Sequence, residues 1–245
     1  MDIHAITLLP EIFQSLYLGL SGKALNTHST LTTHQLRDFS KRADRRIDDR
    51  PFGGGPGMLI SAEPVYQAKK YVRTLSPHTR FVFVDPKGKP FTQQDAKALA
   101  REPSITLVCG RYEGFDQRAY DPNDLTYSIG DFILTGGEIP ACAIIDAILR
   151  LIPGTMGNPE SHEKESFSAK RLEHPQYTRP FTWREQSAPP VLLSGNHNEI
   201  ALWQKEQQLI HTWLKRPDLI PANQLTESEK KLIKQYLEKN RPPPQ

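Results

Sequence analysis

Three clusters of glycine are the residues of this sequence best placed for chemistry with a bound ligand. They comprise residues 53–57 (Gly-Gly-Gly-Pro-Gly), Gly110 with Gly114, and Gly130 with Gly136 and Gly137. Because glycine has no side chain, its backbone N–H and C=O groups can approach a ligand closely. In an open parallel sheet, ligands bind beyond the carboxyl ends of the strands. The clusters therefore favour a ligand crevice, although each cluster taken alone also fits a tight turn.

Several common catalytic motifs are absent from the sequence. It contains no P-loop pattern, no H-E-x-x-H and no G-x-S-x-G. The run that begins at Gly53 fails the dinucleotide-binding pattern, because Met58 occupies the position of its last glycine. Cys109 and Cys142 form no Cys-x-x-Cys pair, and their apolar neighbours predict small buried side chains. We therefore expect no metal site built by protein side chains.

Length and composition indicate a globular protein with either one large domain or one domain and a small companion. The chain has 245 residues, 37% of them hydrophobic and 24% charged. A net charge of +3 and a pI near 8.8 permit a nucleic-acid partner without requiring one. The N-terminus carries Asp2 and Pro10, unlike a signal peptide, and Asp146 and Arg150 interrupt the longest apolar stretch. We expect a cytoplasmic protein with no membrane partner.

The elements that would position the glycine clusters are short apolar runs alternating with helical patterns. Strands are predicted at residues 3–9, 80–84, 105–109 and 127–134. The turn at residues 85–88 should stop the second strand. A helix should begin at residue 138, with Pro140 in its first turn, and end at Pro153-Gly154. This alternation predicts an α/β fold with a sheet.

The C-terminal part has a different composition and should be helical. Residues 155–170 are polar and predict a loop or linker. Residues 199–214 follow a helical period that places Trp203 and Trp213 in a core, and Thr226 begins a capping box with Glu229 before another helix. We expect a domain over residues 1–158, a flexible linker over 159–173 and a helical domain over 174–245.

Six motifs in the sequence are specific enough, when taken together, to indicate a single protein family. They are DDRPFGGGPGM (48–58), LVCGRYEGFD (107–116), YSIGDFILTGGEIPA (127–141), RLIPG (150–154), HPQYTRP (174–180) and PPVLLSGNH (189–197). In this order and spacing, they resemble the bacterial tRNA (guanine-37-N1) methyltransferase family, over nearly the whole chain.

The resemblance implies a fold and an activity. The fold would be α/β, with a parallel sheet, a deep C-terminal trefoil knot and a small helical C-terminal domain that binds tRNA. The enzyme would transfer a methyl group from S-adenosylmethionine (AdoMet) to N1 of guanine 37 in the tRNA anticodon loop. It would work as a homodimer with active sites at the subunit interface. Mg²⁺ assistance is also implied, although the sequence shows no dedicated metal cluster.

The resemblance also assigns residues to the cofactor. The knot loops would hold AdoMet largely through backbone groups. An alternative interpretation places Ile129, Ile133 and Leu134 in the core of a strand, and both can hold because core strands often end in a ligand pocket. The matching positions are Val84, Pro86, Gly110, Tyr112, Glu113, Ile129, Gly130, Asp131, Phe132, Ile133, Leu134, Gly136 and Gly137.

Two residues match the family's catalytic positions. Glu165 would remove the guanine N1 proton, although the family usually has aspartate there, and Glu163 is the alternative acid. Arg150 would stabilise negative charge on guanine O6. By spacing alone, an ordinary helix pair with Asp146 is the favoured interpretation of Arg150, and the motif context reverses this preference.

The remaining site residues would contact RNA. The guanine pocket and the tRNA surface are assigned to Asp49, Arg50, Gly55, Pro56, Gly57, Tyr177, Ser194, Asn196 and His197. Lys205, Lys215 and Arg216 either face RNA or form a solvated helix face. Gln176 departs from the family's usual histidine.

Two other functions remain open from the sequence. One is a knotted ribose 2′-O-methyltransferase, which would not need a base near guanine N1. The other is an RNA-binding protein without turnover, which only the departure at Glu165 favours. A methyl-transfer assay on unmodified tRNA, followed by nucleoside analysis, separates the three.

Overall fold

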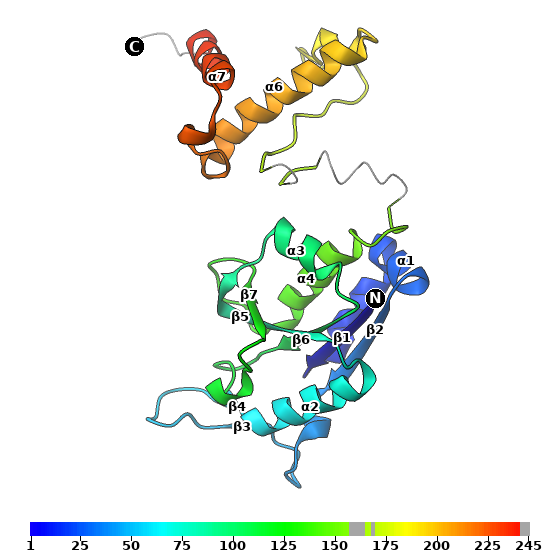
Figure 1. Cartoon of the computed structure of the whole chain (residues 1–245), viewed down its shortest axis with the longest axis vertical. Coiled ribbons are helices and arrows are strands. Elements are labelled where there is room, and N and C mark those ends of the chain that lie inside the picture. Colours follow the sequence, from blue (N-terminus) through cyan, green and yellow to red (C-terminus); the bar gives the residue numbers. More distant parts are fainter. Residues whose placement is uncertain (157–164, 168–169, 241–245) are drawn as a thin grey trace. The chain divides into compact units, whose positions relative to one another are not determined.

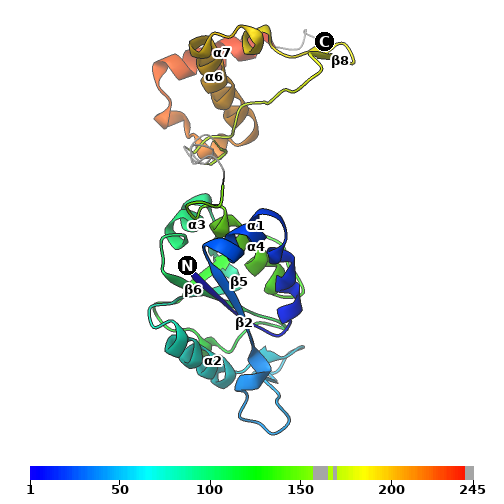
Figure 2. The ribbon, with the colours of Figure 1, turned by 90° about the vertical axis from the view of Figure 1, so that its right-hand side faces the viewer.

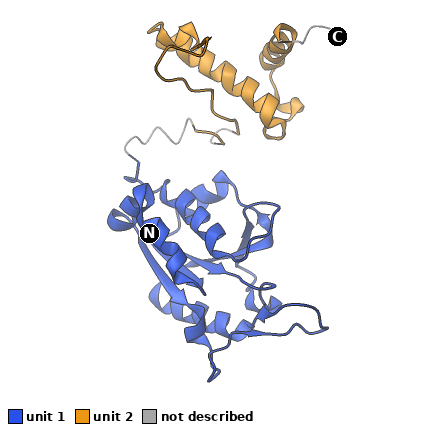
Figure 3. Ribbon diagram, turned by 180° about the vertical axis from the view of Figure 1, so that it is seen from behind, with its two compact units in different colours: residues 1–159 blue, residues 160–245 orange. Residues whose placement is uncertain are grey.

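The computed structural model describes residues 1–156, 165–167 and 170–240. The chain divides into two compact units, Met1–Pro159 and Glu160–Gln245, which Figure 3 colours separately. Within the linker expected at residues 159–173, positions 159–164 and 168–169 lie outside the described residues.

Unit 1 is built on a parallel sheet of five strands (Figure 1). The strands are β1 (Asp2–Thr7), β2 (Thr30–Gln35), β5 (Arg80–Pro90), β6 (Ser104–Cys109) and β7 (Leu125–Ser128). Their order is β2-β1-β6-β5-β7, and every neighbouring pair is parallel. The predicted α/β class with a parallel sheet is therefore confirmed.

Helices cover both faces of this sheet. One core contains α1 (Gly19–Thr27), α3 (Gln93–Leu99) and α4 (Glu138–Leu149), packed on residues such as Val82 and Leu107. The other contains α2 (Ala62–Leu75), packed on Phe81 and Phe83. Neighbouring strand residues enter different cores because successive side chains point to opposite faces. Figure 1 shows α3 and α4 on one side of the sheet and α2 on the other.

The connections of unit 1 include shorter elements. They are η1 (Pro10–Tyr17), η2 (Leu36–Phe39), η3 (Gln117–Ala119), and the antiparallel strands β3 (Asp48–Asp49) and β4 (Leu59–Ile60). The glycine-rich residues 53–57 thus lie in the loop between β3 and β4. This pair lies outside the main sheet.

The predicted element boundaries need three corrections. The turn at residues 85–88 does not end its strand, since β5 resumes after a register shift and pairs Lys89 with Tyr127. The strand predicted over 127–134 ends at Ser128, whose hydroxyl bonds both the backbone nitrogen and the carbonyl of Gly130. Finally, α4 ends at Leu149 rather than at Pro153.

The described residues of unit 2, 165–167 and 170–240, form two long helices and a short hairpin. Its elements are β8 (Thr182–Trp183), β9 (Gln186–Ser187), η4 (Pro190–Leu193), α6 (His197–Lys215), η5 (Pro217–Leu219), η6 (Ala222–Gln224) and α7 (Glu227–Lys239). Figure 2 shows the hairpin extending out from the helices. The capping box of Thr226 and Glu229 is confirmed. Trp213 packs on the small core, whereas Trp203 is only partly buried and lies near the rings of His174 and Tyr177.

Candidate functional site

A cavity of about 270 Å³ lies beyond the carboxyl ends of β6 and β7, beside the register shift that follows Val84 in β5. Every residue predicted to contact the cofactor lines it except Asp131, which belongs to the same loop as its neighbours Gly130 and Phe132. The lining residues from that prediction are Val84, Pro86, Gly110, Tyr112, Glu113, Ile129, Gly130, Phe132, Ile133, Leu134, Gly136 and Gly137. The glycine clusters that follow β6 and β7 therefore meet at one place.

Backbone contacts join the two glycine loops. Arg111 and Gly136 form an isolated antiparallel bridge, and the nitrogen of Gly137 donates to the carbonyl of Gly110 over 2.8 Å. A Cβ atom on Gly137 would lie 2.9 Å from the nitrogen of Gly110. This approach is possible only for glycine, so the need for close backbone contact explains the residue type.

The wall of the cavity presents apolar side chains to solvent. Phe132 is 54% exposed, Ile133 is 79% exposed and Leu134 is 39% exposed. Because exposed apolar side chains concentrated on one loop indicate a binding surface, this part of the wall is suited to a ligand or a protein partner.

A buried carboxylate lies behind the two loops. Glu138, at the start of α4, is 1% exposed, accepts a hydrogen bond from the hydroxyl of Thr7 and pairs with Nε of Arg111 at 3.2 Å. Arg111 itself lines the cavity. Sequence reasoning assigned no role to Arg111 or Glu138, and the signal available was a single acid between two glycines and an apolar helix.

A second polar pair fixes the loop that follows Val84. Asp85 accepts a hydrogen bond from the Tyr120 hydroxyl over 2.9 Å and another from the nitrogen of Lys87 over 2.8 Å. Burial, followed by the bond to Asp85, raises the pKa of Tyr120 above its ordinary range. Tyr120 therefore remains a hydrogen-bond donor at every physiological pH. Sequence reasoning also missed this pair.

The loop predicted to hold guanine lies against the cavity. The nitrogen of Glu113 donates to the carbonyl of Met58 over 3.0 Å. A Cβ atom on Gly57 would lie 2.4 Å from the Glu113 side chain, and Gly57 has φ of +81°. The structure thus brings the predicted base-binding Gly57 to the predicted cofactor-binding Glu113. Gly55 and Pro56 lie in the same exposed loop.

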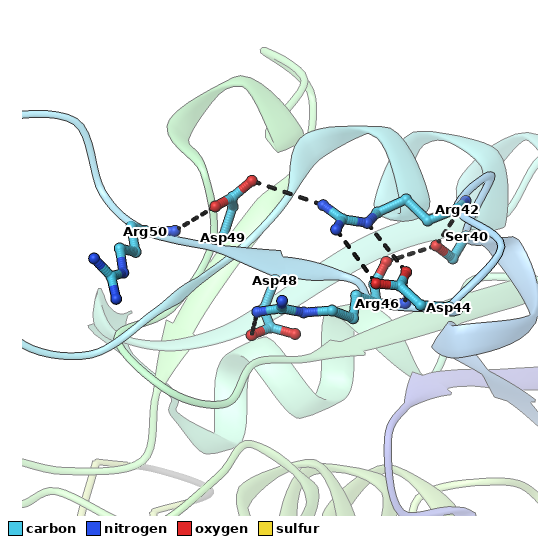
Figure 4. Close-up of polar contacts among 7 residues, drawn as sticks. All are labelled: Ser40, Arg42, Asp44, Arg46, Asp48, Asp49 and Arg50. Atoms are coloured by element: carbon cyan, nitrogen blue, oxygen red, sulfur yellow. Dashed lines mark hydrogen bonds and ion pairs between the residues drawn. The ribbon is translucent and has the colours of Figure 1, made fainter.

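Asp49 and Arg50 lie at the start of that loop, within a network of charges (Figure 4). One oxygen of Asp49 accepts from the backbone nitrogen of Arg50 over 2.8 Å, and the other lies 3.9 Å from Arg42. Arg42 also bonds Asp44 and thereby lowers the pKa of that carboxyl. The Asp49 side chain is 73% exposed, so it remains accessible to a guanine base of RNA.

The two predicted catalytic residues belong to different units. Arg150 is the half-buried C-cap residue of α4 in unit 1. The carboxylate of Asp146, its alternative helix partner, accepts a hydrogen bond from the Ser21 hydroxyl of α1. Glu165 belongs to unit 2, and its fallback, Glu163, lies outside the described residues.

The predicted RNA-facing residues of unit 2 have local structural roles. Asn196 is the N-cap of α6, and its side chain accepts from the nitrogens of Asn198 and Glu199. The hydroxyl of Ser194 accepts from the nitrogen of Asn196 over 3.1 Å. His197, the first residue of α6, is exposed. Tyr177 is half-exposed, with its ring centroid 6.4 Å from that of Trp203. The motif that contains Ser194 and Asn196 therefore caps the start of α6, and this structural role does not depend on RNA binding.

Over residues 1–156, 165–167 and 170–240, no three His, Cys, Asp or Glu residues group as metal ligands. Within the same ranges, no helix has the length and apolar character that crossing a membrane requires.

The fold and the cavity define a class of protein: a parallel α/β domain with a ligand cavity at the carboxyl ends of its strands, joined to a helical unit. A family model described as tRNA (Guanine-1)-methyltransferase TrmD matches residues 1–222. The chain therefore belongs to the tRNA (guanine-1)-methyltransferase family, and the resemblance drawn from its motifs is confirmed.

Curated relatives agree with this assignment. The tRNA (guanine-N(1)-)-methyltransferase of Syntrophotalea carbinolica is 44% identical over 237 residues, which is 96% of each chain. The protein of the same name from Alcanivorax borkumensis is 44% identical over 96% of this chain and 92% of its own length. That from Lactobacillus helveticus is 43% identical over 96% of this chain and 98% of its own.

Proposed function

We propose that this protein transfers a methyl group from AdoMet to N1 of guanine 37 in the tRNA anticodon loop. The observation that carries the proposal is the contact between the Gly57–Met58 loop and Glu113 on the cavity wall. A base held by that loop would lie beside a cofactor held in the cavity. Family membership supports both the reaction and the tRNA substrate.

The cavity suits AdoMet. Gly110, Gly136 and Gly137 line it with backbone rather than with side chains, and Ile129 and Leu134 add apolar wall. Ligand sites of this kind combine a mostly apolar lining with a few placed polar groups. AdoMet, when bound, supplies the methyl group. The Glu138–Arg111 pair and the Asp85–Tyr120 bond hold the loops in position.

The remaining chemistry falls to side chains of this chain. Guanine N1 is a poor nucleophile while it carries its proton, so the Glu165 carboxylate removes that proton. As the proton leaves, negative charge collects on O6, and the planar guanidinium of Arg150 stabilises it. Asp49 and Arg50 help the glycine-rich loop to hold the base. Mg²⁺ assistance, which the resemblance implies, belongs to the same proposal, although the described residues contain no dedicated cluster of metal ligands.

The larger organisation belongs to the same proposal. The sheet carries a deep C-terminal trefoil knot, and two copies form a homodimer with active sites at the interface. Residues 1–158 bind AdoMet, residues 159–173 form a flexible linker, and residues 174–245 bind tRNA, with Tyr177, Ser194, Asn196 and His197 on the RNA side. The protein acts in the cytoplasm.

The test is methyl transfer to an unmodified tRNA transcript, followed by nucleoside analysis. We expect 1-methylguanosine, and no product from a transcript with adenosine at position 37. A 2′-O-methylated nucleoside would show a ribose methyltransferase instead. Binding without any product would show an RNA-binding protein.

A further inference from the structure

An exposed tryptophan and an arginine lie together at the tip of the β8–β9 hairpin. Trp183 is 58% exposed, and the guanidinium carbon of Arg184 lies 4.6 Å from the centroid of the Trp183 ring. This distance is within the range of a cation–π contact. Over the described part of the chain, Arg184 has no ion pair with an acid. The guanidinium thus lies over the exposed indole ring.

The turn that presents this stack is strained. Arg184 has φ of 46° and Glu185 has φ of 64°, so both central residues of the two-residue loop are left-handed. Such a turn strongly prefers Asn-Gly, because side chains disfavour positive φ. Here two long charged residues occupy it instead. Strain of this kind persists where the surrounding structure enforces it, and it concentrates at functional sites.

The flanking strands hold the turn in place. The backbone pairs Thr182 with Ser187, and the two hydroxyls lie 2.8 Å apart. The pairing extends one step further, since the nitrogen of Ala188 donates to the carbonyl of Phe181 over 2.9 Å. Phe181, which is 45% exposed, precedes Trp183 by two residues and therefore lies on the same face of the ribbon.

We propose that this hairpin is a stacking platform for an unpaired base of tRNA, with Trp183 as the platform. The proposal rests on the proposed function, and it adds a contact to the tRNA surface of unit 2. Aromatic side chains bind unstacked bases in this way because every base has a π-face. Arg184 fixes the indole in position and brings positive charge for the adjacent phosphate.

Charge and size favour RNA over a protein partner. Arg179 and Arg184 give the hairpin region two cations against the single acid Glu185. The exposed aromatic surface consists of the rings of Trp183 and Phe181, whereas a stable protein interface needs roughly 800 Å² from each partner. A single base needs far less surface than that.

The first test measures the Kd of the full chain for an unmodified tRNA transcript, without AdoMet. Trp183→Ala should weaken binding about five- to a hundredfold, the equivalent of losing one base stack. Trp183→Phe should recover most of the affinity, since phenylalanine still stacks. Tyr66→Ala is the matched control, because Tyr66 is an equally exposed aromatic on α2 of unit 1, and it should bind as the wild type does. Wild-type affinity in Trp183→Ala would overturn the proposal, as would equal losses in Trp183→Ala and Trp183→Phe.

The second test separates binding from hairpin stability. The double variant Arg184→Asn with Glu185→Gly supplies the preferred turn and removes the guanidinium. We expect a melting temperature at or above that of the wild type, together with weaker tRNA binding. If the turn only stabilises the hairpin, this variant will bind tRNA as tightly as the wild type or more tightly. That result would contradict the proposal.

The two proposals fail in different ways. If the wild type binds tRNA but forms no 1-methylguanosine, the proposed function fails and the hairpin result stands. If the wild type methylates tRNA and Trp183→Ala binds tRNA normally, only the hairpin proposal fails, and a protein partner becomes the explanation of the exposed stack. In active enzyme, Trp183→Ala should raise KM for tRNA and leave kcat nearly unchanged, because the role proposed for Trp183 is to bind tRNA and not to move the proton or the methyl group.

Discussion

Among single residues, Glu165, the base that we propose for the N1 proton, has the largest expected effect on rate. Glu165→Gln keeps the shape of the side chain but removes the base, so the methyl-transfer step should slow by about 10²-fold or more. AdoMet affinity should stay within a few-fold, because no cavity residue changes. Single-turnover kinetics on tRNA measures the step, and titration of AdoMet measures the affinity.

Two companion variants identify the acid. Glu165→Asp keeps the carboxylate and should retain substantial activity. Glu163→Gln changes the neighbouring acid of the same polar segment and should be close to the wild type. If Glu163→Gln is inactive and Glu165→Gln is active, the base is Glu163.

At the residue scale, the sequence predicted the residues that line the cavity far better than the buried polar pairs that hold those residues in place. Gly110 and Gly137 carry a local signal, because glycine after a strand marks a close backbone approach. Glu138 stands out locally only as an acid between two glycines and an apolar helix, and its partners are not marked at all, since Thr7 and Arg111 are 131 and 27 residues away in the chain. A buried polar pair of this kind is specified by the tertiary fold, which a local pattern does not contain.

Among the elements, α2 is fixed to the loop before β7 by one buried lysine. Lys69 is 2% exposed, pairs with Asp124 and Asp121, and lies 5.1 Å from the centroid of Phe81. Lys69→Met should lower the free energy of unfolding by about 3–5 kcal/mol, because Asp124 would remain buried without its cation. Urea denaturation followed by circular dichroism measures the change.

Arg73 is the matched control for Lys69. It lies one turn later on α2, pairs with Asp121 at 3.1 Å and lies 5.0 Å from the Phe81 ring, but its side chain is 47% exposed. Arg73→Met should cost no more than about 1 kcal/mol, since exposed pairs contribute little. Equal losses in the two variants would show that burial does not decide the effect.

A buried histidine pair joins β1, β2 and α2 and should make stability depend on pH. Nδ1 of His4 lies 3.0 Å from Nε2 of His34, and Nε2 of His4 lies 3.0 Å from the Ser76 hydroxyl. The ring of Tyr71 meets His34 edge-on, and Asp2 is the acid that acts on His4. Burial, then the neighbouring His4, lowers the pKa of His34 to about 4.

The sign follows from the lowered pKa. The fold favours neutral His34, so its contribution is complete above pH 6.5 and is lost as the pH falls from 6.5 towards 4. The loss for this residue is about 3 kcal/mol at most. Thermal melts between pH 7.5 and about 4.5 should show the decline. His34→Gln, which carries no charge at any pH, should show a smaller decline, and an equal one would contradict this account.

The elements themselves were predictable where one local pattern decided them. β1 and β6 are continuous buried runs, and α7 begins at the capping box of Thr226. β7 was predicted too long because Ile133 and Leu134 continue the apolar pattern, yet they line the cavity rather than the sheet. The β8–β9 hairpin was missed because its turn, Arg184-Glu185, contains neither glycine nor asparagine.

At the scale of the whole molecule, the proposed mechanism requires residues from both units. Arg150 and the cavity belong to unit 1, and Glu165 belongs to unit 2. In a homodimer with shared sites, each complete site takes its cavity from one subunit and its Glu165 from the other. Because the proposal places every complete site between two subunits, the active protein should sediment as a dimer. An active monomer would contradict the proposal.

A heterodimer of two inactive subunits tests the sharing directly. One subunit carries Glu165→Gln, and its partner carries Leu134→Trp, which fills the cavity from a half-exposed position on its wall. Each variant alone should form inactive dimers, and the second should also fail to bind AdoMet. With differently tagged subunits purified together, one of the two sites would combine an intact cavity with an intact Glu165, so about half of the wild-type activity should return. If each site lies within a single subunit, every site in the heterodimer keeps one defect, and no activity above the parent variants would appear.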